Sequence, residues 1–199
     1  MTLKLNGSSS GYTAIDAPAA AGSNTLTLPA NNGSNGQFLQ TNGSGVMSWA
    51  SASGWKILQV VTATSVSHIN TTSDFPQASG ISLNITPAAT GNNILLIASF
   101  QCHLSGGSNN DRIGLYGIRD EGNTIIAQFR YGASSSDEAG QNLFGSNTVH
   151  RMYSPNTTSQ KTYTLVYGRY SSGYNNTVNI NGGGGGDNRT TLTAIEVGS

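Results

Sequence analysis

The sequence predicts an all-β protein, in which a short extended N-terminal module is followed by a jelly-roll-like β-sandwich. About nine short apolar runs recur roughly every 10–20 residues, and turn-forming Gly, Asn and Ser separate them. No run repeats with the period of a helix. Ser, Thr, Asn and Gly make up about half of the 199 residues, as exposed strand faces and turns require.

Charge is scarce in this chain. Charged residues are 9% of the total, with nine Lys and Arg against nine Asp and Glu, so the formal net charge is zero. No basic cluster exists that could bind phosphates or an anionic membrane surface, which argues against nucleic acid and against polybasic membrane attachment. The hydrophobic content of 36% is too high for a disordered tail.

The single cysteine, Cys102, cannot form an intrachain disulfide. Stability is therefore expected from burial or from oligomerisation. The polar start of the chain shows no secretory signal, and no apolar run approaches the ~20 residues that span a bilayer. We expect a protein that is made in a cytosol, is not exported by the general route and is not inserted in a membrane.

Residues 1–53 are predicted to form the N-terminal module. Short strands are expected at 12–18, 25–28 and 37–40, and Ser51–Gly54 is expected to be a linker. The apolar residues of this module are too sparse for one copy of the chain to bury. We expect three copies to pack them around a shared axis, through Leu26, Leu28, Phe38 and Trp49.

Residues 54–199 are predicted to form the sandwich. Leu83-Asn84-Ile85 and Val178-Asn179-Ile180 alternate as half-buried strands do, and the apolar run from Ile94 to Ala98 is expected to be a central strand. The nine expected strands span residues 56–66, 81–86, 94–104, 112–119, 124–131, 148–153, 162–170, 177–180 and 191–197. Many short strands without a convincing helix favour a sandwich.

Two groups of segments resemble a known class of protein. Leu26–Pro29, Gly36–Thr41 and Gly43–Trp49 together resemble a motif of bacteriophage tail-fibre and other structural proteins, particularly of phages of marine and aquatic bacteria, where it precedes a C-terminal domain. This resemblance covers roughly residues 1–50. The last runs of the chain are similar to the final strands of phage fibre and tail-tip domains; they are Lys161–Tyr167, Thr177–Asn181 and Thr191–Val197.

The resemblance implies a homotrimeric tail-fibre protein of the virion, whose C-terminal jelly roll acts as a host-receptor adhesin. Residues 1–53 would attach to other tail or baseplate proteins, and loops of the C-terminal domain would contact a glycan or protein of the bacterial surface. Several weak contacts on one trimer, and several trimers on one virion, would give stable attachment by multivalent binding.

Tyrosines and polar residues in expected loops are the candidate receptor contacts. A tyrosine offers a flat apolar face and a hydroxyl group, so it can stack on a sugar and hydrogen-bond its rim. The expected loops are 109–111, 131–138, 170–175 and 182–189. The candidates are Tyr131, Tyr170, Tyr174, Asp187 and Arg189. The glycine run 182–186 fits either a flexible hairpin connection or a distal loop near the receptor.

No catalytic, metal or cofactor site is expected. The three histidines lack the spacing of a metal-binding pair. Cys102 and its neighbour His103 would need an orienting Asn or Asp in space to form a nucleophilic pair. Asp137 and Glu138 are adjacent, so on a strand they would point to opposite faces and could not flank one glycosidic bond.

Three other functions stay open. The chain could be a virion decoration or capsid-fibre protein that shares the fold but has no receptor role. It could be a glycan depolymerase, although nine acidic residues offer few converging carboxylates. It could also be a cellular lectin or a trimeric cytokine-like ligand, which the N-terminal motif disfavours.

Overall fold

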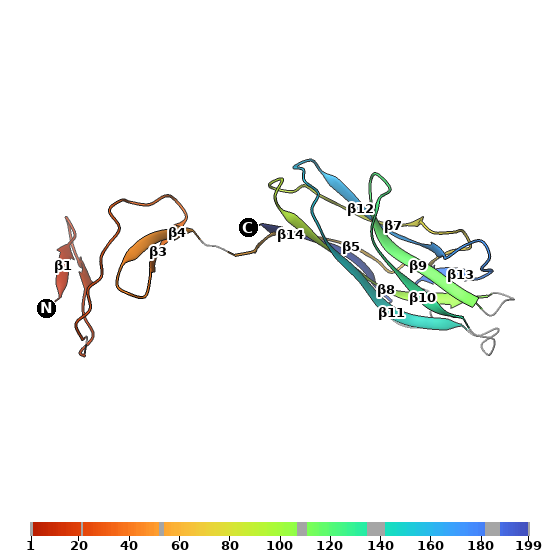
Figure 1. The fold of residues 1–199 in the computed structure, drawn as a ribbon, viewed down its shortest axis with the longest axis horizontal. Coiled ribbons are helices and arrows are strands. Elements are labelled where there is room, and N and C mark those ends of the chain that lie inside the picture. Colours follow the sequence, from red (N-terminus) through yellow and green to blue (C-terminus); the bar gives the residue numbers. More distant parts are fainter. Residues whose placement is uncertain are drawn as a thin grey trace. The chain divides into compact units, whose positions relative to one another are not determined.

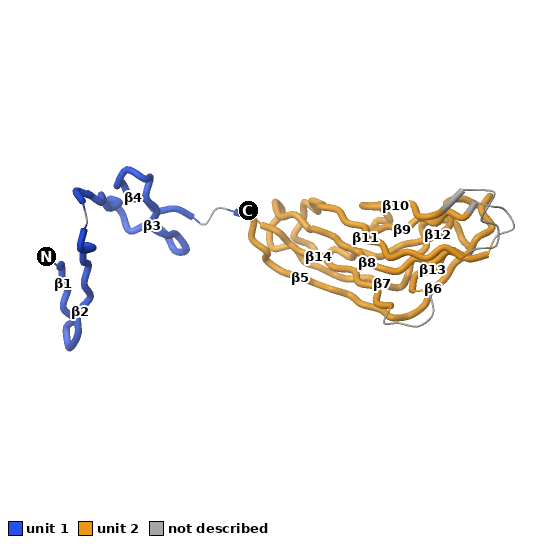
Figure 2. The backbone as a smooth tube through the Cα atoms, turned by 90° about the horizontal axis from the view of Figure 1, so that it is seen from below, with its two compact units in different colours: residues 1–54 blue, residues 55–199 orange. Residues whose placement is uncertain are grey.

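A computed structural model describes residues 2–20, 22–51, 54–106, 111–134, 142–181 and 188–198. All regular structure in these ranges is β-strand and none is helix, so the all-β prediction is confirmed. Contacts divide the chain into two compact units, Met1–Gly54 and Trp55–Ser199 (Figure 2).

The first unit contains two antiparallel hairpins. β1 (Leu3–Asn6) pairs with β2 (Tyr12–Ile15), and β3 (Gln37–Thr41) pairs with β4 (Met47–Ser51). All side chains of β1 and β2 are exposed, because two strands alone have no second layer against which to bury a face.

The prediction of a strand at 25–28 is wrong, because only a single isolated β-bridge forms there, between Thr27 and Val46. Two strands of the first unit were not predicted, β1 and β4. The turn that joins β3 to β4 depends on Asn42, whose side-chain oxygen accepts the backbone N–H groups of Ser44 and Val46. Asn favours such turns because its short side chain replaces a backbone acceptor.

The described residues of the second unit form ten strands. Figure 1 shows how they are arranged. They are β5 (Lys56–Ser65), β6 (Ile69–Thr71), β7 (Gln77–Ile85), β8 (Asn93–Ser105), β9 (Asp111–Asp120), β10 (Ile125–Ser134), β11 (Leu143–Tyr153), β12 (Lys161–Arg169), β13 (Thr177–Ile180) and β14 (Thr190–Gly198).

These strands form two sheets of a sandwich-like fold. One sheet has four antiparallel strands in the order β10-β9-β12-β7. In the other, β8 lies at the centre, with β11 along one edge and β14 followed by β13 along the opposite edge. β5 pairs with the far edge of β14, and β6 with that of β13. Side chains from both sheets contribute to one buried core.

Strict alternation along β8 determines which of its residues form the core. Every second side chain from Ile94 to Leu104 is buried, with exposures of 0–2%. The ring of Phe100 stacks on that of Tyr116 from the opposite sheet, with centroids 5.1 Å apart, and Tyr116 in turn stacks on Phe129 at 5.7 Å. Such aromatic pairs add roughly 0.5–1.5 kcal/mol beyond the area they bury.

All nine strands expected in this unit are present, and β6 is an additional one. Ile69–Thr71 is too short to show a period, and it becomes a strand because it pairs with β13. β7 and β11 begin several residues before their expected starts. Their added residues include Ser79 and Gly145, which carry no apolar signal and are placed by their neighbours.

A buried carboxylate joins β14 to its surroundings. Glu196 is fully buried and accepts hydrogen bonds from the side chains of Gln59 and Asn92 and from the backbone N–H of Ala88. Burial by itself raises the pKa of this carboxyl, but the three hydrogen bonds together outweigh burial, so the pKa lies below its usual value of 4.5. The carboxylate therefore ties β14 to β5 and to the loop before β8.

We expect Glu196→Gln to lower the free energy of unfolding by about 1–3 kcal/mol, because an amide cannot accept all three hydrogen bonds and one buried donor loses its partner. Urea denaturation of the full chain measures this change. Glu121→Gln is the control, since it removes a half-exposed ion pair with Lys161 that contributes at most about 1 kcal/mol. Equal effects of the two substitutions would contradict the structural role of Glu196.

The same carboxylate predicts a pH dependence. A folded-state pKa below the unfolded value adds stability that is fully present above pH 4.5 and is lost as the pH falls through the folded pKa. The difference in unfolding free energy between the native chain and Glu196→Gln should therefore be constant near neutral pH and shrink below pH 4.5. A difference in unfolding free energy that stays constant down to strongly acidic pH would show that Glu196 is not ionised in the folded protein.

Candidate functional site

Two tyrosines meet just beyond the end of β12. The rings of Tyr170 and Tyr174 lie edge to face, with centroids 5.7 Å apart and planes at 90°. The guanidinium carbon of Arg130, on β10, lies 5.5 Å from the centroid of the Tyr170 ring. Tyr170 is 48% exposed, and Arg130 is exposed as well. We call Tyr170, Tyr174 and Arg130 the aromatic cluster.

An arginine holds the loop of the aromatic cluster in place. Arg169 is the last residue of β12, and its carbonyl accepts the backbone N–H of Phe75. Its guanidinium donates to the Tyr174 carbonyl at 3.0 Å and lies 3.3 Å from the Asp74 carboxylate. The loop is therefore fixed to the segment before β7 by backbone and side-chain contacts together.

Two glycines allow that segment to lie on the sheet. A Cβ atom on Gly168 would lie 2.6 Å from the backbone nitrogen of Phe75, and one on Gly117 would lie 3.3 Å from the Phe75 ring. Any larger residue at Gly168 would displace the backbone that pairs with Arg169. Glycine is needed here because two stretches of backbone approach each other closely.

The aromatic cluster has the chemistry of a shallow recognition surface. An exposed tyrosine ring can stack on the apolar face of a sugar, and its hydroxyl can hydrogen-bond the rim. The guanidinium of Arg130 supplies fixed donors beside the Tyr170 ring. Sequence reasoning missed Arg130, because it lies inside a predicted strand 40 positions before Tyr170 and meets it only through pairing of both strands with β9.

Tyr131 lies apart from the aromatic cluster. Its expected position in a loop is wrong, because it belongs to β10 and its side chain packs against the core. Its hydroxyl donates to the Phe144 carbonyl at 2.6 Å. A Cβ on Gly145 would lie 2.9 Å from the Tyr131 ring, so the ring fills a space that this glycine provides.

The other loop candidates cannot be grouped with the aromatic cluster. Asp187 lies outside the described residues, as do residues 109–110, 135–138 and 182–187 of the expected loops. Arg189 is described; it is exposed and directly precedes β14.

The residues expected to pack between copies differ in exposure within one chain. Leu26, Leu28 and Phe38 are 65%, 69% and 47% exposed. Trp49 is half-buried, and its indole N–H donates to the Asn31 carbonyl at 2.7 Å.

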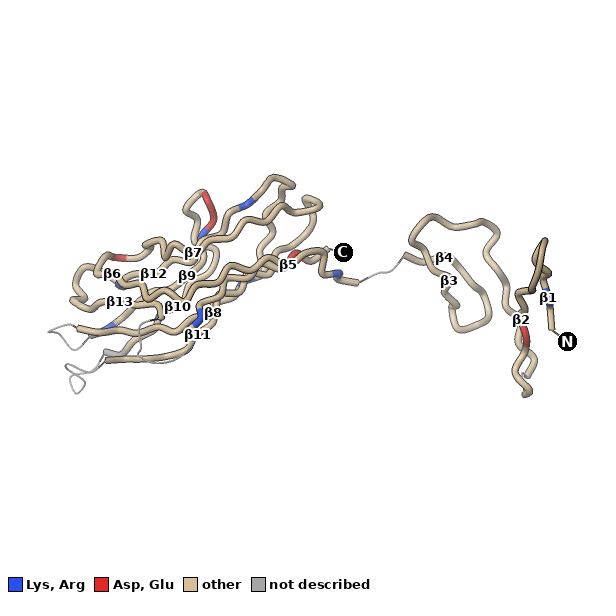
Figure 3. Tube along the Cα trace, turned by 180° about the vertical axis from the view of Figure 1, so that it is seen from behind, with Lys and Arg blue, Asp and Glu red and all other residues tan. Residues whose placement is uncertain are grey.

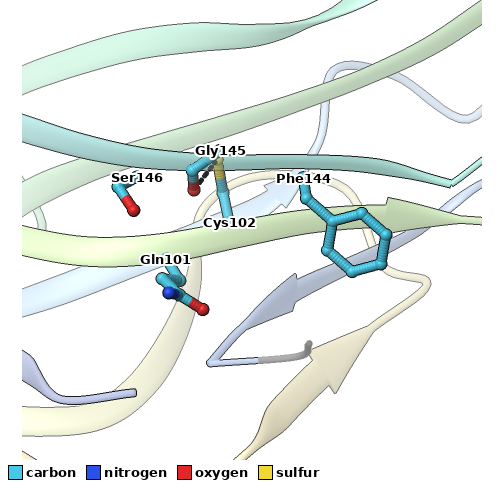
Figure 4. Close-up of a pocket in the computed structure, with 5 residues that line it drawn as sticks. All are labelled: Gln101, Cys102, Phe144, Gly145 and Ser146. Carbon is cyan, nitrogen blue, oxygen red and sulfur yellow. Dashed lines mark hydrogen bonds between the residues drawn. The ribbon is translucent and has the colours of Figure 1, made fainter. Parts of the chain in front are cut away.

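A small open pocket of about 180 Å³ lies beside the cysteine (Figure 4). It is lined by Gln101, Cys102, Phe144, Gly145 and Ser146. The Cys102 thiol donates to the Gly145 carbonyl at 3.3 Å, and the side-chain amide of Asn147 donates to the sulfur at 2.8 Å. Burial raises the pKa of this thiol to about 11, against a smaller lowering by the Asn147 hydrogen bond. The thiol is therefore protonated at neutral pH.

The histidines do not converge on a metal site. His103 stacks on Phe144 with centroids 4.2 Å apart, and burial lowers its pKa. His68 is hydrogen-bonded to Asn179 at 3.0 Å. Within the described ranges, no group of three or more His, Cys, Asp or Glu could hold a metal ion. No helix among these residues is long and apolar enough to cross a membrane.

Comparisons with known proteins identify no family. No family model matches the chain, and no curated protein matches it. One solved structure that matches is an arabinose-bound α-L-arabinofuranosidase, 11% identical, covering 87% of this chain and 29% of that chain with a TM-score of 0.29. Another is a structure of the Gx strain of infectious bursal disease virus. It is 12% identical and covers 76% of this chain and 42% of that chain, with a TM-score of 0.25. The chain spans less than half the length of either, and we draw no inference from these scores.

We expect Cys102 to be unreactive in the folded chain. With a pKa of about 11, roughly one thiol in a thousand is ionised at pH 8, and the sulfur is also buried. Mass spectrometry after maleimide treatment should find the native protein unmodified and the urea-unfolded protein fully modified. A Ser172→Cys variant supplies an exposed thiol as control; labelling of native Cys102 at the same rate would contradict the prediction.

Proposed function

We propose that this chain is a phage tail-fibre structural protein that acts as a host-receptor adhesin. The observation that carries the adhesin role is the aromatic cluster, in which exposed Tyr170 packs against half-buried Tyr174 with a guanidinium beside it, held on a sheet by Arg169. The assignment to phage fibres rests on the resemblance of residues 26–49 to the fibre motif. The virion is then the site of action, reached after synthesis in the host cytoplasm.

The strand order supports the jelly-roll class for the sandwich. The four main strands of one sheet follow the order β5-β14-β8-β11, and those of the other follow β7-β12-β9-β10. A chain that passes between two four-stranded antiparallel sheets in this way forms the two Greek keys of a jelly roll. The aromatic cluster then lies where β12 leaves the sheet.

Exposure in the first unit supports a homotrimer. Leu26, Leu28 and Phe38 present large apolar side chains to solvent in one chain, and copies of the chain can cover them. Residues 1–53 would serve as the shaft and as the docking segment for tail or baseplate proteins. The sandwich, residues 54–199, would then present the aromatic cluster three times in each trimer.

The mechanism that follows is multivalent adhesion. The chain as a whole carries nine basic and nine acidic residues, so its net charge gives no general preference for a strongly anionic polymer over a neutral glycan or a protein surface. Arg130, the charged member of the cluster, can donate hydrogen bonds to acceptors on such a surface. Weak sites linked on one particle act at high effective concentration, and this converts brief contacts into stable attachment.

Recognition through the aromatic cluster predicts a loss of binding in Tyr170→Ala and Tyr174→Ala. Each substitution should weaken single-site binding by about 1–3 kcal/mol, or roughly 5- to 150-fold. Tyr170→Ala removes the exposed stacking face, and Tyr174→Ala removes the half-buried ring that packs edge to face against it. The full chain is tested on an array of bacterial lipopolysaccharide and capsule glycans and on whole bacteria. On whole cells the loss should be steeper, because several sites act together.

Tyr12→Ala is the matched control, since Tyr12 is 60% exposed but lies in the first unit. Tyr131→Ala is a second comparison, expected to lower stability because the ring packs against the core. If both cluster variants bound all glycans and cells as the native chain does, with unfolding unchanged, the receptor site would have to be elsewhere on the molecule.

Two measurements separate this proposal from its alternatives. Immuno-electron microscopy of intact phage particles places the chain at the tail or on the capsid, and a capsid position would favour a decoration or capsid-fibre protein. Incubation with the glycan that binds should leave its size distribution unchanged. Release of new reducing ends would favour a depolymerase instead.

A further inference from the structure

The sheet that contains β8 has an outward face, and none of the strands described in the sandwich lies over it. One row of residues on this face crosses four strands, each directly opposite the next: Val60, Ile195, Leu95 and Met152. All four are apolar. Val60 is 56% exposed and Met152 is 44% exposed, although both belong to well-paired strands. We call these four residues the apolar row.

The next two rows on one side of the apolar row contain no Lys, Arg, Asp or Glu. They consist of Thr62, Thr193, Ile97 and His150, and of Thr64, Thr191, Ser99 and Thr148. Some hydroxyl groups are already paired within the face, Thr62 with Thr193 at 3.1 Å and Thr148 with Ser99 at 3.3 Å. A partner can therefore cover them without leaving these pairs unsatisfied.

No Lys, Arg, Asp or Glu points outward from β5, β14, β8 or β11, all of which are described throughout. Side chains alternate between the two faces along each strand, and the charged residues occupy the positions of the inward face; they are Lys56, Arg151 and Glu196. Figure 3 shows how few charged residues the sandwich carries. We call the outward side of these four strands the neutral face.

The opposite sheet differs in both respects. Its outward side carries Arg119 and Arg130, and the segment around Phe75 lies on it. As a result Val166 on that side is fully buried, although it points away from the core. Within the described part of the sandwich, the segment around Phe75 thus covers one sheet, and no comparable segment lies over the other.

We propose that the neutral face is the surface through which copies of the sandwich meet in the trimer, with the apolar row at the contact. This inference rests on the proposed homotrimer and names its contact surface in the second unit. The occupant is a second copy of this chain because symmetry brings equivalent residues close together near the axis, where any charge would meet its own copy. A face without charges meets that condition, whereas a different partner is usually selected by complementary charge.

The size of the neutral face sets the area that each copy can contribute. Four strands about 4.8 Å apart and some nine residues long, at about 3.3 Å per residue, span on the order of 570 Å². In a closed trimer each face is divided between two neighbours, so each contact covers on the order of 570 Å² counted over both copies, below the roughly 1,200 Å² of a standard specific interface. Contacts between the N-terminal units would add to this area.

The test is the mass of the full chain in solution. The native protein should sediment at micromolar concentration as three chains of 20.6 kDa. The double variant Val60→Lys, Met152→Lys places two charges on the face at exposed positions, and its mass should fall towards that of one chain. Ser82→Lys, Gln128→Lys is the control, because it adds the same charges to exposed positions of the other sheet.

Cross-linking tests the same face without disturbing it by charge. The double variant Val60→Cys, Met152→Cys should give covalent multimers with a bis-maleimide, and Ser82→Cys, Gln128→Cys should not. Buried Cys102 does not interfere. Unfolding curves that match the native chain show that each variant is folded.

The outcomes separate the two proposals. A native chain that sediments as a monomer overturns both the neutral-face contact and the homotrimer. A native trimer that keeps its mass in Val60→Lys, Met152→Lys and gives no cross-links through the introduced thiols overturns the neutral face alone. Glycan binding by the Tyr170 and Tyr174 variants is measured independently, because these residues lie on the other sheet.

Discussion

Burial of one strand, β8, is the constraint on which the rest of the sandwich depends. It is the longest strand, it pairs with β11 on one edge and with β14 and β13 on the other, and its alternate side chains form the centre of the core. With one cysteine the chain cannot form an intrachain disulfide, and the two ion pairs found among its described residues are isolated ones that could not replace this contribution. Each fully buried Leu or Ile contributes roughly 1.5–3 kcal/mol, so burial must supply the stability.

The position of the aromatic cluster follows from that core. Tyr116 of β9 stacks on Phe100 of β8, and β9 in turn pairs with β12, so the end of β12 is held by strands that are themselves buried. Arg169 and Phe75 then connect the loop to a second segment of backbone. A loop supported in this way would lose little conformational freedom on binding the proposed receptor.

Alternation in the sequence predicts the core strands well, and it predicts long-range pairing poorly. β8 is readable because its apolar run is continuous and long, whereas β6 has three residues and exists only through β13. The sequence predicts a loop position for Tyr131 because Gly132 follows it. In the structure β10 continues through Tyr131, and both Phe129 and Tyr131 point inward and pack against the core. The meeting of Arg130 with Tyr170 depends on the register of three strands, which no local pattern encodes.

The edges of the two sheets influence how copies of the chain can associate. A chain with zero net charge and exposed apolar residues tends to self-associate, and open strand edges would make that association indefinite. Register shifts interrupt the pairing of β5, β7 and β10, which are edge strands, and such irregularities discourage addition of a further strand. β11 is also an edge strand, and its pairing with β8 is regular throughout, so this edge has no such irregularity. Contact through edges extends a sheet, whereas contact through faces can close around an axis, so association through the neutral face would keep the assembly closed.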